Sequence, residues 1–368
     1  MAELIITGGS RLRDGAWAPA DVVCRDGVVV DDGPPSGETT ARIDASGLLV
    51  APGFIDLQCN GGLGIDLTRT PERLWDLGAA LPRWGVTAWL PTIVTAPDGA
   101  VDAALAVLAA GPPEGWVGAM PLGLHLEGPF LARQKRGAHR EDLLREPTLD
   151  AIEGWSRAHG VALVTLAPDL RGAEPVLRAL VERGVVVSLG HSPATAAEAT
   201  AGVDAGARWV THLFNAMAPL HHREPGLAGV ALTDPRVHVG LIADGIHVHP
   251  TVVAMAQRAL GPRLTLVTDA VAAMGRSEAP EAGGVRLADG TLAGSDLPMD
   301  QAVRNLVAFS GCASADAVIA GSAAPAAVLG ETARGHLGPG ARADLVLLTP
   351  GLQVVATVVG GTVVHDAR

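Results

Sequence analysis

The middle of the chain alternates between two kinds of segment. From residue 53 onward, apolar runs of about four to eight residues are separated by stretches rich in Ala, Leu and Arg. Short apolar runs are typical of strands that are buried on both faces, and the stretches between them are typical of helices. This alternation predicts repeated βα units and a parallel sheet.

Eight such strands can be counted, and eight βα units predict a closed (β/α)8 barrel. With boundary errors of a few residues, we place the strands near residues 53–58, 86–92, 118–127, 161–167, 185–190, 209–213, 237–243 and 264–269.

Both ends of the chain have a different, β-rich texture. Before about residue 51, short β-rich runs at 4–6 and 28–30 are separated by Gly, Asp and Pro turns such as residues 31–35, which predicts a small antiparallel sheet. The same texture returns after residue 336, in the runs around 344–348 and 354–364. We therefore expect the two ends to meet in one small β domain.

Composition narrows the possible functions. The chain has 368 residues, of which 48% are hydrophobic and 18% charged, so it is globular and can bury a large core. A formal net charge of −12 and only 3% aromatic residues argue against nucleic acid and anionic membranes as partners. Three widely spaced cysteines, no leader-like N-terminus and no run of about 18 apolar residues predict a cytoplasmic protein.

Polar side chains stand where several predicted strands end. Barrel enzymes carry their active-site groups at the carboxyl ends of strands, so these residues are more informative than polar residues in helices. The strand-end residues are Asp56, Gln58, Asn60, His125, Glu127, His191, His212, Asp244, His247, His249 and Asp269.

Glu127, His191 and His212 form a candidate metal site. One carboxylate and two imidazoles from different strand ends give three ligands and an open fourth position, as a hydrolytic Zn²⁺ or Fe²⁺ centre requires. A single strand-end histidine could equally be a core or capping residue, but several at one edge weaken that alternative. We expect His125 to orient a ligand or pack below the metal, and His249 to be structural at a helix start.

Asp269 ends the eighth predicted strand and is suited to accept a proton from water and return it to the leaving group. The alternative is an N-cap for a following helix. Lys135 is the only lysine and lies in a loop-like stretch, which argues against a Schiff base or a bridging modified lysine. Neither a P-loop motif nor a G-x-S-x-G motif occurs, which argues against P-loop nucleotide hydrolases and α/β-hydrolases.

Seven short motifs, collinear over nearly the whole chain, together resemble one family. They are PGFID at 52–56, HLEGPF at 125–130, GHS at 190–192, HLFNAM at 212–217, REPG at 223–226, ADG-x-H at 243–247 and TDA at 268–270. The combination resembles the N-acetylglucosamine-6-phosphate deacetylases of the amidohydrolase superfamily. The first motif is generic to amidohydrolases, whereas HLEGP, HLFNAM and REPG together are specific to the deacetylases.

The resemblance implies a (β/α)8 barrel over 52–336 and a small β-sandwich formed by 1–51 and 337–368. It implies metal-dependent conversion of N-acetyl-D-glucosamine 6-phosphate to D-glucosamine 6-phosphate and acetate, in amino-sugar catabolism and cell-wall recycling. One divalent metal per subunit is implied on Glu127, His191 and His212, with Zn²⁺ expected and Fe²⁺, Co²⁺ or Mn²⁺ also compatible. Asp269 is implied as the proton acceptor and donor, and His139 as a group near the acetyl carbonyl. Residues implied to contact substrate are Ala138, Asn215, Ala216, Arg223, His247, Leu292, Ala293 and Gly294.

The first strand departs from the commonest amidohydrolase pattern. Most members carry His-x-His there to hold a second metal, whereas this chain has Gln58, Cys59 and Asn60. Neutral amides are weak ligands beside imidazole, and some deacetylases share this arrangement with one metal, so we expect a mononuclear site. Cys59 alternates to the opposite face of the strand from its neighbours, and we interpret it as a packing residue.

Arg223 separates the competing functions, because a phosphate monoester is well matched by a guanidinium group. Another metal-dependent amidohydrolase, such as a cyclic amidase or a deaminase, would share the barrel and the metal but lack this pocket. A non-catalytic scaffold is less consistent with the retained ligands and base. In the family the matching arginine reaches the neighbouring subunit's site, which implies a homodimer; His221 and His222 beside it are left without a role.

Overall fold

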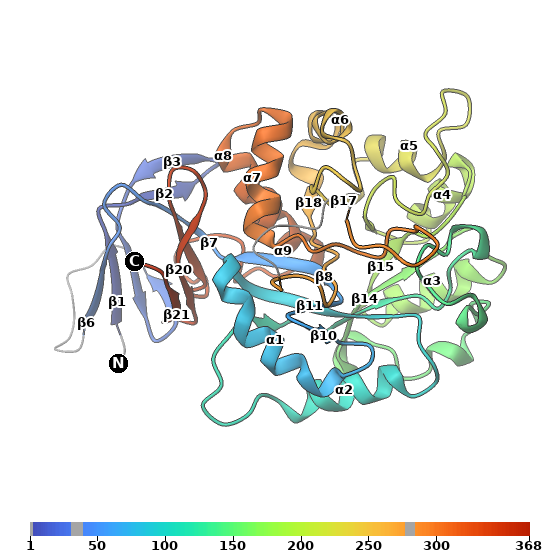
Figure 1. The fold of residues 1–368 in the computed structure, drawn as a ribbon, viewed down its shortest axis with the longest axis horizontal. Coiled ribbons are helices and arrows are strands. Elements are labelled where there is room, and N and C mark those ends of the chain that lie inside the picture. The colour runs from blue at the N-terminus through green and yellow to red at the C-terminus, as the bar shows by residue number, and fades with distance from the viewer. Residues whose placement is uncertain (1–2, 31–39, 277–283) are drawn as a thin grey trace.

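The structure is a computed structural model, and it describes residues 3–30, 40–276 and 284–368. The turn expected at 31–35 lies outside the described residues. Figure 1 shows two parts: a β domain that contains both chain ends, and a larger part in which helices surround a barrel of strands.

The larger part confirms the predicted (β/α)8 barrel. Its strands pair in parallel and follow one another in chain order. They are β8 (Phe54–Cys59), β11 (Val86–Val94), β12 (Met120–Pro121) continued by β13 (Leu124–Glu127), β14 (Val161–Leu166), β15 (Val186–Leu189), β16 (Trp209–Val210), β17 (His238–Leu241) and β18 (Leu264–Leu266). Nearly every residue of these strands is buried, because one face lines the barrel interior and the other lies under the helices.

The barrel closes between its first and last strands. The backbone N–H of Asp269 donates to the carbonyl of Gln58 over 2.9 Å. At the preceding residue of the last strand segment, the hydroxyl of Thr268 donates to Asp56 Oδ2 over 2.6 Å. Burial raises the pKa of Asp56 to about 7, even though its hydrogen bonds from Thr268 act in the other direction. These contacts hold the segments that carry Gln58 and Asp269 side by side.

Helices cover the outside of the barrel. The third strand is the exception to the strict βα repeat, because it is followed by short 3₁₀ turns within residues 133–159 and not by an α-helix. A short hairpin, β9 (Gly61–Gly62) and β10 (Ile65–Asp66), follows the first strand. The helices are α1 (Leu74–Ala80), α2 (Ala100–Ala110), α3 (Ala173–Glu182), α4 (Ala196–Asp204), α5 (Gly226–Thr233), α6 (Pro250–Leu260), α7 (Met299–Ser310), α8 (Ser314–Gly321) and α9 (Ala323–Leu329).

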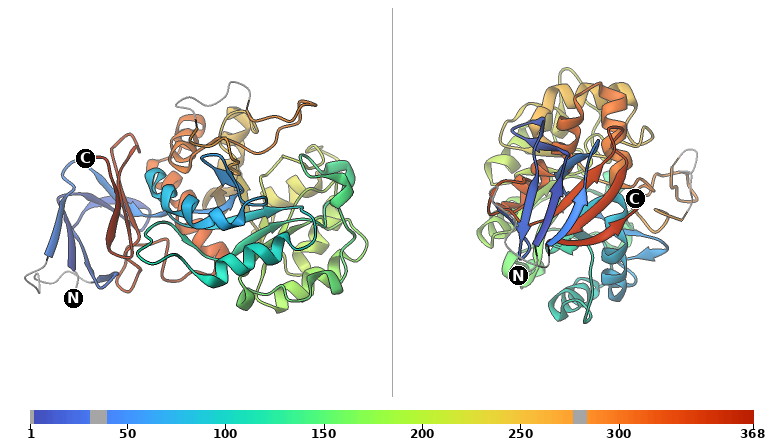
Figure 2. Two further views of the ribbon diagram at one scale, coloured as in Figure 1. Left: turned by 60° about the horizontal axis from the view of Figure 1, so that its bottom comes forward. Right: turned by 90° about the vertical axis from the view of Figure 1, so that its left-hand side faces the viewer.

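The β domain is a sandwich of two sheets, and its apolar core includes Leu4, Val29 and Leu345. Figure 2 shows strands from the two chain ends lying side by side within it. One sheet has the order β5-β4-β1-β6 and the other the order β21-β20-β19-β7-β2-β3. The strands are β1 (Glu3–Thr7), β2 (Ser10–Arg13), β3 (Ala16–Pro19), β4 (Val22–Arg25), β5 (Val28–Val30), β6 (Thr40–Asp44), β7 (Leu49–Pro52), β19 (Leu345–Leu348), β20 (Val354–Val359) and β21 (Thr362–Asp366).

The expectation of one small antiparallel sheet at the N-terminus was wrong. The N-terminal strands are divided between both sheets, and β1 pairs with β6, and β2 with β7, in parallel. Between β1 and β6, and again between β2 and β7, the chain crosses to the other sheet and back. The second strand of each pair can therefore run in the same direction as the first.

Among the described residues, no helix is both long and apolar enough to cross a membrane.

Candidate active site

A cavity of about 460 Å³ opens at the carboxyl ends of the barrel strands. Parallel strands all end at this edge, so side chains that are far apart in the sequence meet there. Nearly all the residues that the sequence assigned to the site line it: Glu127, Ala138, His139, His191, His212, Asn215, Ala216, His247, Asp269, Leu292, Ala293 and Gly294.

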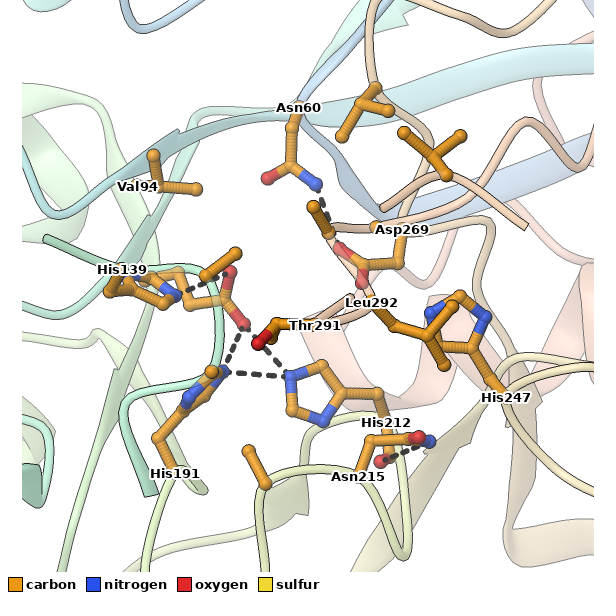
Figure 3. A pocket seen from close by; sticks show the side chains of 18 of the residues that line it. Asn60, Val94, His139, His191, His212, Asn215, His247, Asp269, Thr291 and Leu292 are labelled. Carbon is orange, nitrogen blue, oxygen red and sulfur yellow. Dashed lines mark hydrogen bonds and ion pairs between the residues drawn. The ribbon is translucent and has the colours of Figure 1, made fainter. Parts of the chain in front are cut away.

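Three donor atoms converge at the floor of the cavity. The Nε2 atoms of His191 and His212 lie 3.0 Å apart. Glu127 Oε1 lies 3.3 Å from the first and 3.1 Å from the second. Figure 3 shows these two imidazoles turned toward each other on the side of the cavity opposite Asp269. All three side chains are buried, so the donors face one another without bulk water.

This triangle fits a divalent cation. Ligands placed tetrahedrally about 2.0–2.1 Å from a metal lie roughly 3.3–3.4 Å apart, close to the spacing seen here. The Nδ1–H of His191 donates to the carbonyl oxygen of Lys135 over 3.0 Å, which leaves the Nε2 lone pair free for a metal. His212 Nδ1 is buried with no hydrogen-bond partner among the described residues. One divalent cation would satisfy the three facing donors.

The electrostatics of Glu127 agree with a cation site. Burial opposes its ionisation, but the facing imidazoles of His139, His191 and His212 outweigh burial and hold the pKa of Glu127 well below its ordinary value. Burial lowers the pKa of His191 to about 4. A charged carboxylate beside a neutral imidazole is the protonation state that metal binding requires.

A second grouping of donors overlaps the first. Donor atoms of Glu127, His139 and His191 also lie within 4.8 Å of one another. His139 Nε2 is 3.6 Å from Glu127 Oε2, and its ring packs edge-on against that of His191. Geometry therefore leaves a choice between His139 and His212 for the third ligand.

Asp269 faces the triangle from the other side of the cavity. Its Oδ1 accepts hydrogen bonds from Asn60 Nδ2 at 2.7 Å and from Gln58 Nε2 at 3.0 Å. Burial, and then the charge of Glu127, raise the pKa of Asp269 to about 6. In the described part of the chain, no helix begins between Asp269 and α7, so the alternative of a helix cap is not supported.

Gln58 presents its amide nitrogen, not its oxygen, to the carboxylates of Glu127 and Asp269, and Asn60 presents its amide nitrogen to Asp269. Gln58 Nε2 also donates to Glu127 Oε1 over 2.8 Å. The hydroxyl of Thr211 donates to Gln58 Oε1 over 2.5 Å and fixes the amide in this orientation. One amide N–H₂ group therefore lies between the two carboxylates and donates to both.

The backbone at the site is strained. His191, Ala216 and Asp269 adopt left-handed φ angles of 52°, 52° and 47°. For non-glycine residues this conformation costs roughly 1–2 kcal/mol each. Such strain is typical of functional sites, because the surrounding fold holds the side chain where the chemistry needs it.

The far end of the cavity contains His247. Its Nδ1–H donates to Asp244 Oδ2 over 2.6 Å, and Asp244 Oδ1 accepts the backbone N–H groups of Ile246 and His247 at 2.8 Å. The carboxylate thus fixes the ring orientation, and Figure 3 shows His247 beyond Asp269 at the cavity wall. Sequence reasoning identified both residues as strand-end groups but not their pairing.

Arg223 is the one predicted substrate contact that does not line the cavity of its own chain. It lies on an exposed loop, where its Nη1 donates to His222 Nε2 over 2.9 Å. Its backbone N–H donates to His221 Nδ1 over 3.3 Å. The two histidines that the sequence left without a role therefore support the conformation of this loop.

Three other residues that the sequence singled out, His249, Cys59 and His125, contact groups of the fold outside the cavity. His249 caps α6 by accepting the Thr251 N–H, as expected. Cys59 is fully buried in the apolar core, which confirms its interpretation as a packing residue. His125 is buried, with its Nε2 2.8 Å from the hydroxyl of Thr165 and its Nδ1 3.4 Å from that of Thr92.

Known proteins with similar sequences identify the family to which this chain belongs. The model of the amidohydrolase family matches residues 49–364. The chain belongs to the amidohydrolase family. This amidohydrolase is 40% identical over 398 residues to human N-acetylglucosamine-6-phosphate deacetylase, covering 99% of this chain and 94% of the human protein. It is 41% identical over 344 residues to N-acetylgalactosamine-6-phosphate deacetylase from Escherichia coli O157:H7, covering 89% and 90%.

A solved structure extends the similarity to the whole fold. This amidohydrolase superposes with a TM-score of 0.86, at 34% identity, on a mutant of N-acetyl-D-glucosamine-6-phosphate deacetylase from Mycobacterium smegmatis in complex with N-acetyl-D-glucosamine-6-phosphate. The match covers 99% of this chain and 100% of that one. The resemblance to the deacetylases that the motifs indicated is confirmed.

Proposed function

We propose that this amidohydrolase hydrolyses the acetamide of N-acetyl-D-glucosamine 6-phosphate to D-glucosamine 6-phosphate and acetate. The observation that carries the proposal is the arrangement of Glu127, His191 and His212 opposite Asp269 in one cavity. Relatives of about 40% identity over nearly the full chain are named for this reaction. A scaffold without activity would not need these buried, strained and facing groups.

We infer that Glu127, His191 and His212 hold one divalent cation per chain, with Zn²⁺ as the expected ion. The His212 donor lies 3.1 Å from the Glu127 donor, within the compact triangle that suits a metal, whereas the His139 donor is farther from the carboxylate. A cation bound there supplies Lewis acidity at the reacting carbonyl. The amide groups of Gln58 and Asn60 favour a single cation over two.

Asp269 and His139 have different roles in proton transfer and hydrogen bonding. Asp269 accepts a proton from the attacking water and later delivers it to the departing amine. Gln58 and Asn60 donate to its Oδ1, which directs the other oxygen to the substrate. His139, across the cavity, is placed to donate a hydrogen bond to the carbonyl oxygen as negative charge develops on it.

Recognition of the phosphate is assigned to His247 and Arg223. His247 is held by Asp244 at the cavity wall, whereas Arg223 lies outside the cavity of its own chain. We propose that Arg223 enters the cavity of a second copy, so the working unit is a homodimer. A cytoplasmic location, with which three free cysteines are consistent, also remains a prediction.

Arg223→Ala tests the phosphate assignment. We expect KM for the phosphorylated sugar to rise about ten- to a hundred-fold, because a charge-assisted contact contributes roughly 1.5–3 kcal/mol. The slow reaction with unphosphorylated N-acetylglucosamine should change little. His222→Ala is a control for loop conformation, and equal losses with both substrates in Arg223→Ala would indicate a structural role.

Asp269 sets the pH dependence. It accepts a proton only when ionised, and its pKa is raised to about 6. A cation beside Glu127 lessens that repulsion, so kcat should fall with acidification through one limb with a midpoint between about 4 and about 6. Above this limb the carboxylate is ionised and the rate is level. A pH profile of kcat checks this, and an acidic limb that persists in Asp269→Asn would belong to another group.

A substrate panel tests the proposed function directly. Initial rates of amide hydrolysis are measured for N-acetylglucosamine 6-phosphate and its C4 epimer N-acetylgalactosamine 6-phosphate, by release of acetate, and for a cyclic amide, by ring opening. We expect the highest kcat/KM with the first compound. The second arm is needed because one relative of 41% identity is named for the galactose epimer. Activity confined to the cyclic amide would overturn the proposal.

A further inference from the structure

Thr95 lies immediately after β11, at the same edge of the barrel as Glu127, and it contacts His139 twice. Its hydroxyl is 2.9 Å from His139 Nδ1, and its backbone N–H donates to the same nitrogen over 3.4 Å. Thr95 and His139 are each only 7% exposed, so water does not compete for these contacts. None of the motifs in the sequence includes Thr95.

The backbone contact fixes which ring nitrogen of His139 carries the proton. A backbone N–H can only donate, so Nδ1 must accept, and the proton of the neutral ring lies on Nε2. Nε2 is 3.6 Å from Glu127 Oε2, where a lone pair would face a carboxylate and an N–H is attracted to it. The opposite tautomer would leave the buried N–H of Thr95 without an acceptor, which is unfavourable in the absence of competing water.

His191 has the opposite arrangement. Its Nδ1 faces the carbonyl oxygen of Lys135, which can only accept, so its proton lies on Nδ1 and its Nε2 lone pair is free. The rings of His139 and His191 lie 4.6 Å apart and edge-on. Two neighbouring imidazoles of the same cavity are thus given different chemical roles by their backbone partners.

We propose that Thr95 is the positioning residue that makes His139 a hydrogen-bond donor to the substrate and keeps it out of the metal ligand set. The inference deepens the proposed function and rests on it for the identity of the substrate carbonyl. It resolves the choice between His139 and His212, because an Nε2 that carries a proton has no lone pair for a cation.

The test compares Thr95→Val, which keeps the shape and the backbone N–H but loses the hydroxyl, with Thr95→Ser, which keeps both donors. Thr87→Val is the matched control, since Thr87 is a buried threonine of β11, the strand that Thr95 follows, and its hydroxyl contacts the Phe54 carbonyl. Thr95→Val keeps the backbone N–H that fixes the tautomer but loses the shorter of the two contacts that hold the ring in place. We expect it to lower kcat about ten-fold with KM and bound metal unchanged, and the other two variants to stay near wild type. Combined with His139→Gln, Thr95→Val should cause no further loss, because both changes remove one function.

Two readouts need no substrate. In zinc-loaded protein labelled with ¹⁵N in its histidine rings, the His139 signals, assigned by their absence in His139→Gln, should show a protonated Nε2 and a bare Nδ1. His139→Gln should retain one metal per chain, whereas His191→Ala should lose it. A proton on Nδ1, loss of metal from His139→Gln, or a kcat in Thr95→Val equal to that of Thr87→Val would overturn the proposal. If these two readouts are as expected but no acetate is released from any substrate, the proposed function fails and the assigned tautomer stands.

Discussion

Asp269→Asn is expected to lower kcat by about 10²–10⁴-fold while substrate and metal still bind, the usual range for a general acid–base group. Asparagine has nearly the same shape and can still accept hydrogen bonds from Gln58 and Asn60 through its amide oxygen. It cannot accept the proton of the attacking water. The loss should therefore fall on kcat and not on KM.

The measurement is steady-state kinetics together with metal analysis of the same preparation. A variant that keeps one metal per chain and a near-normal kcat would show that Asp269 has a structural role. His139 would then be the first alternative for the base, since its imidazole faces the cavity beside Glu127 and is not one of the three proposed metal ligands.

Glu127→Ala and His191→Ala are expected to lose both the bound metal and at least about 10³-fold in kcat/KM. Each change removes one of three donors that meet within 3.3 Å, and the cation contributes several kcal/mol to transition-state stabilisation. His336→Ala, which changes an exposed histidine outside the cavity, is the control for the effect of removing an imidazole. Full metal content in either ligand variant would mean that the ligand set is wrong.

The barrel could be predicted because of how its strands are buried. Strands covered on both faces are nearly continuous apolar runs, so β14 and β15 stand out in the sequence within a residue or two of their observed limits. The apolar runs also made much of the site recognisable in the sequence. Glu127 and His191 are polar residues that directly end or follow apolar runs, and parallel strands bring such ends to one edge.

Contacts across the barrel could not be predicted in this way. The amide of Gln58 lies between Glu127 and Asp269, and Thr211 orients it, but no spacing in the sequence indicates which atom of an amide faces which partner. Threonine is also common in ordinary strands, so Thr95 and Thr211 carry no separate signal. The strand-end rule would have found Thr95 if the second strand had been extended to Val94, where it ends.

Arg223 marks another limit of sequence reasoning. The REPG motif indicated a functional arginine, and the structure places it on an exposed loop outside the cavity of its own chain. A pattern along one chain does not say which copy of the protein a loop serves. The parallel pairings of β1 with β6 and of β2 with β7 were missed for a related reason, because connections between two sheets leave no local periodicity.

The most direct test of a mononuclear, metal-dependent deacetylase is a metal titration of the protein after treatment with a chelator. Acetate release from N-acetylglucosamine 6-phosphate is followed as Zn²⁺ is added in known amounts. We expect no activity at the start, a linear rise, and a plateau at one equivalent of Zn²⁺ per chain. Full activity without added metal, or a plateau only at two equivalents, would contradict it.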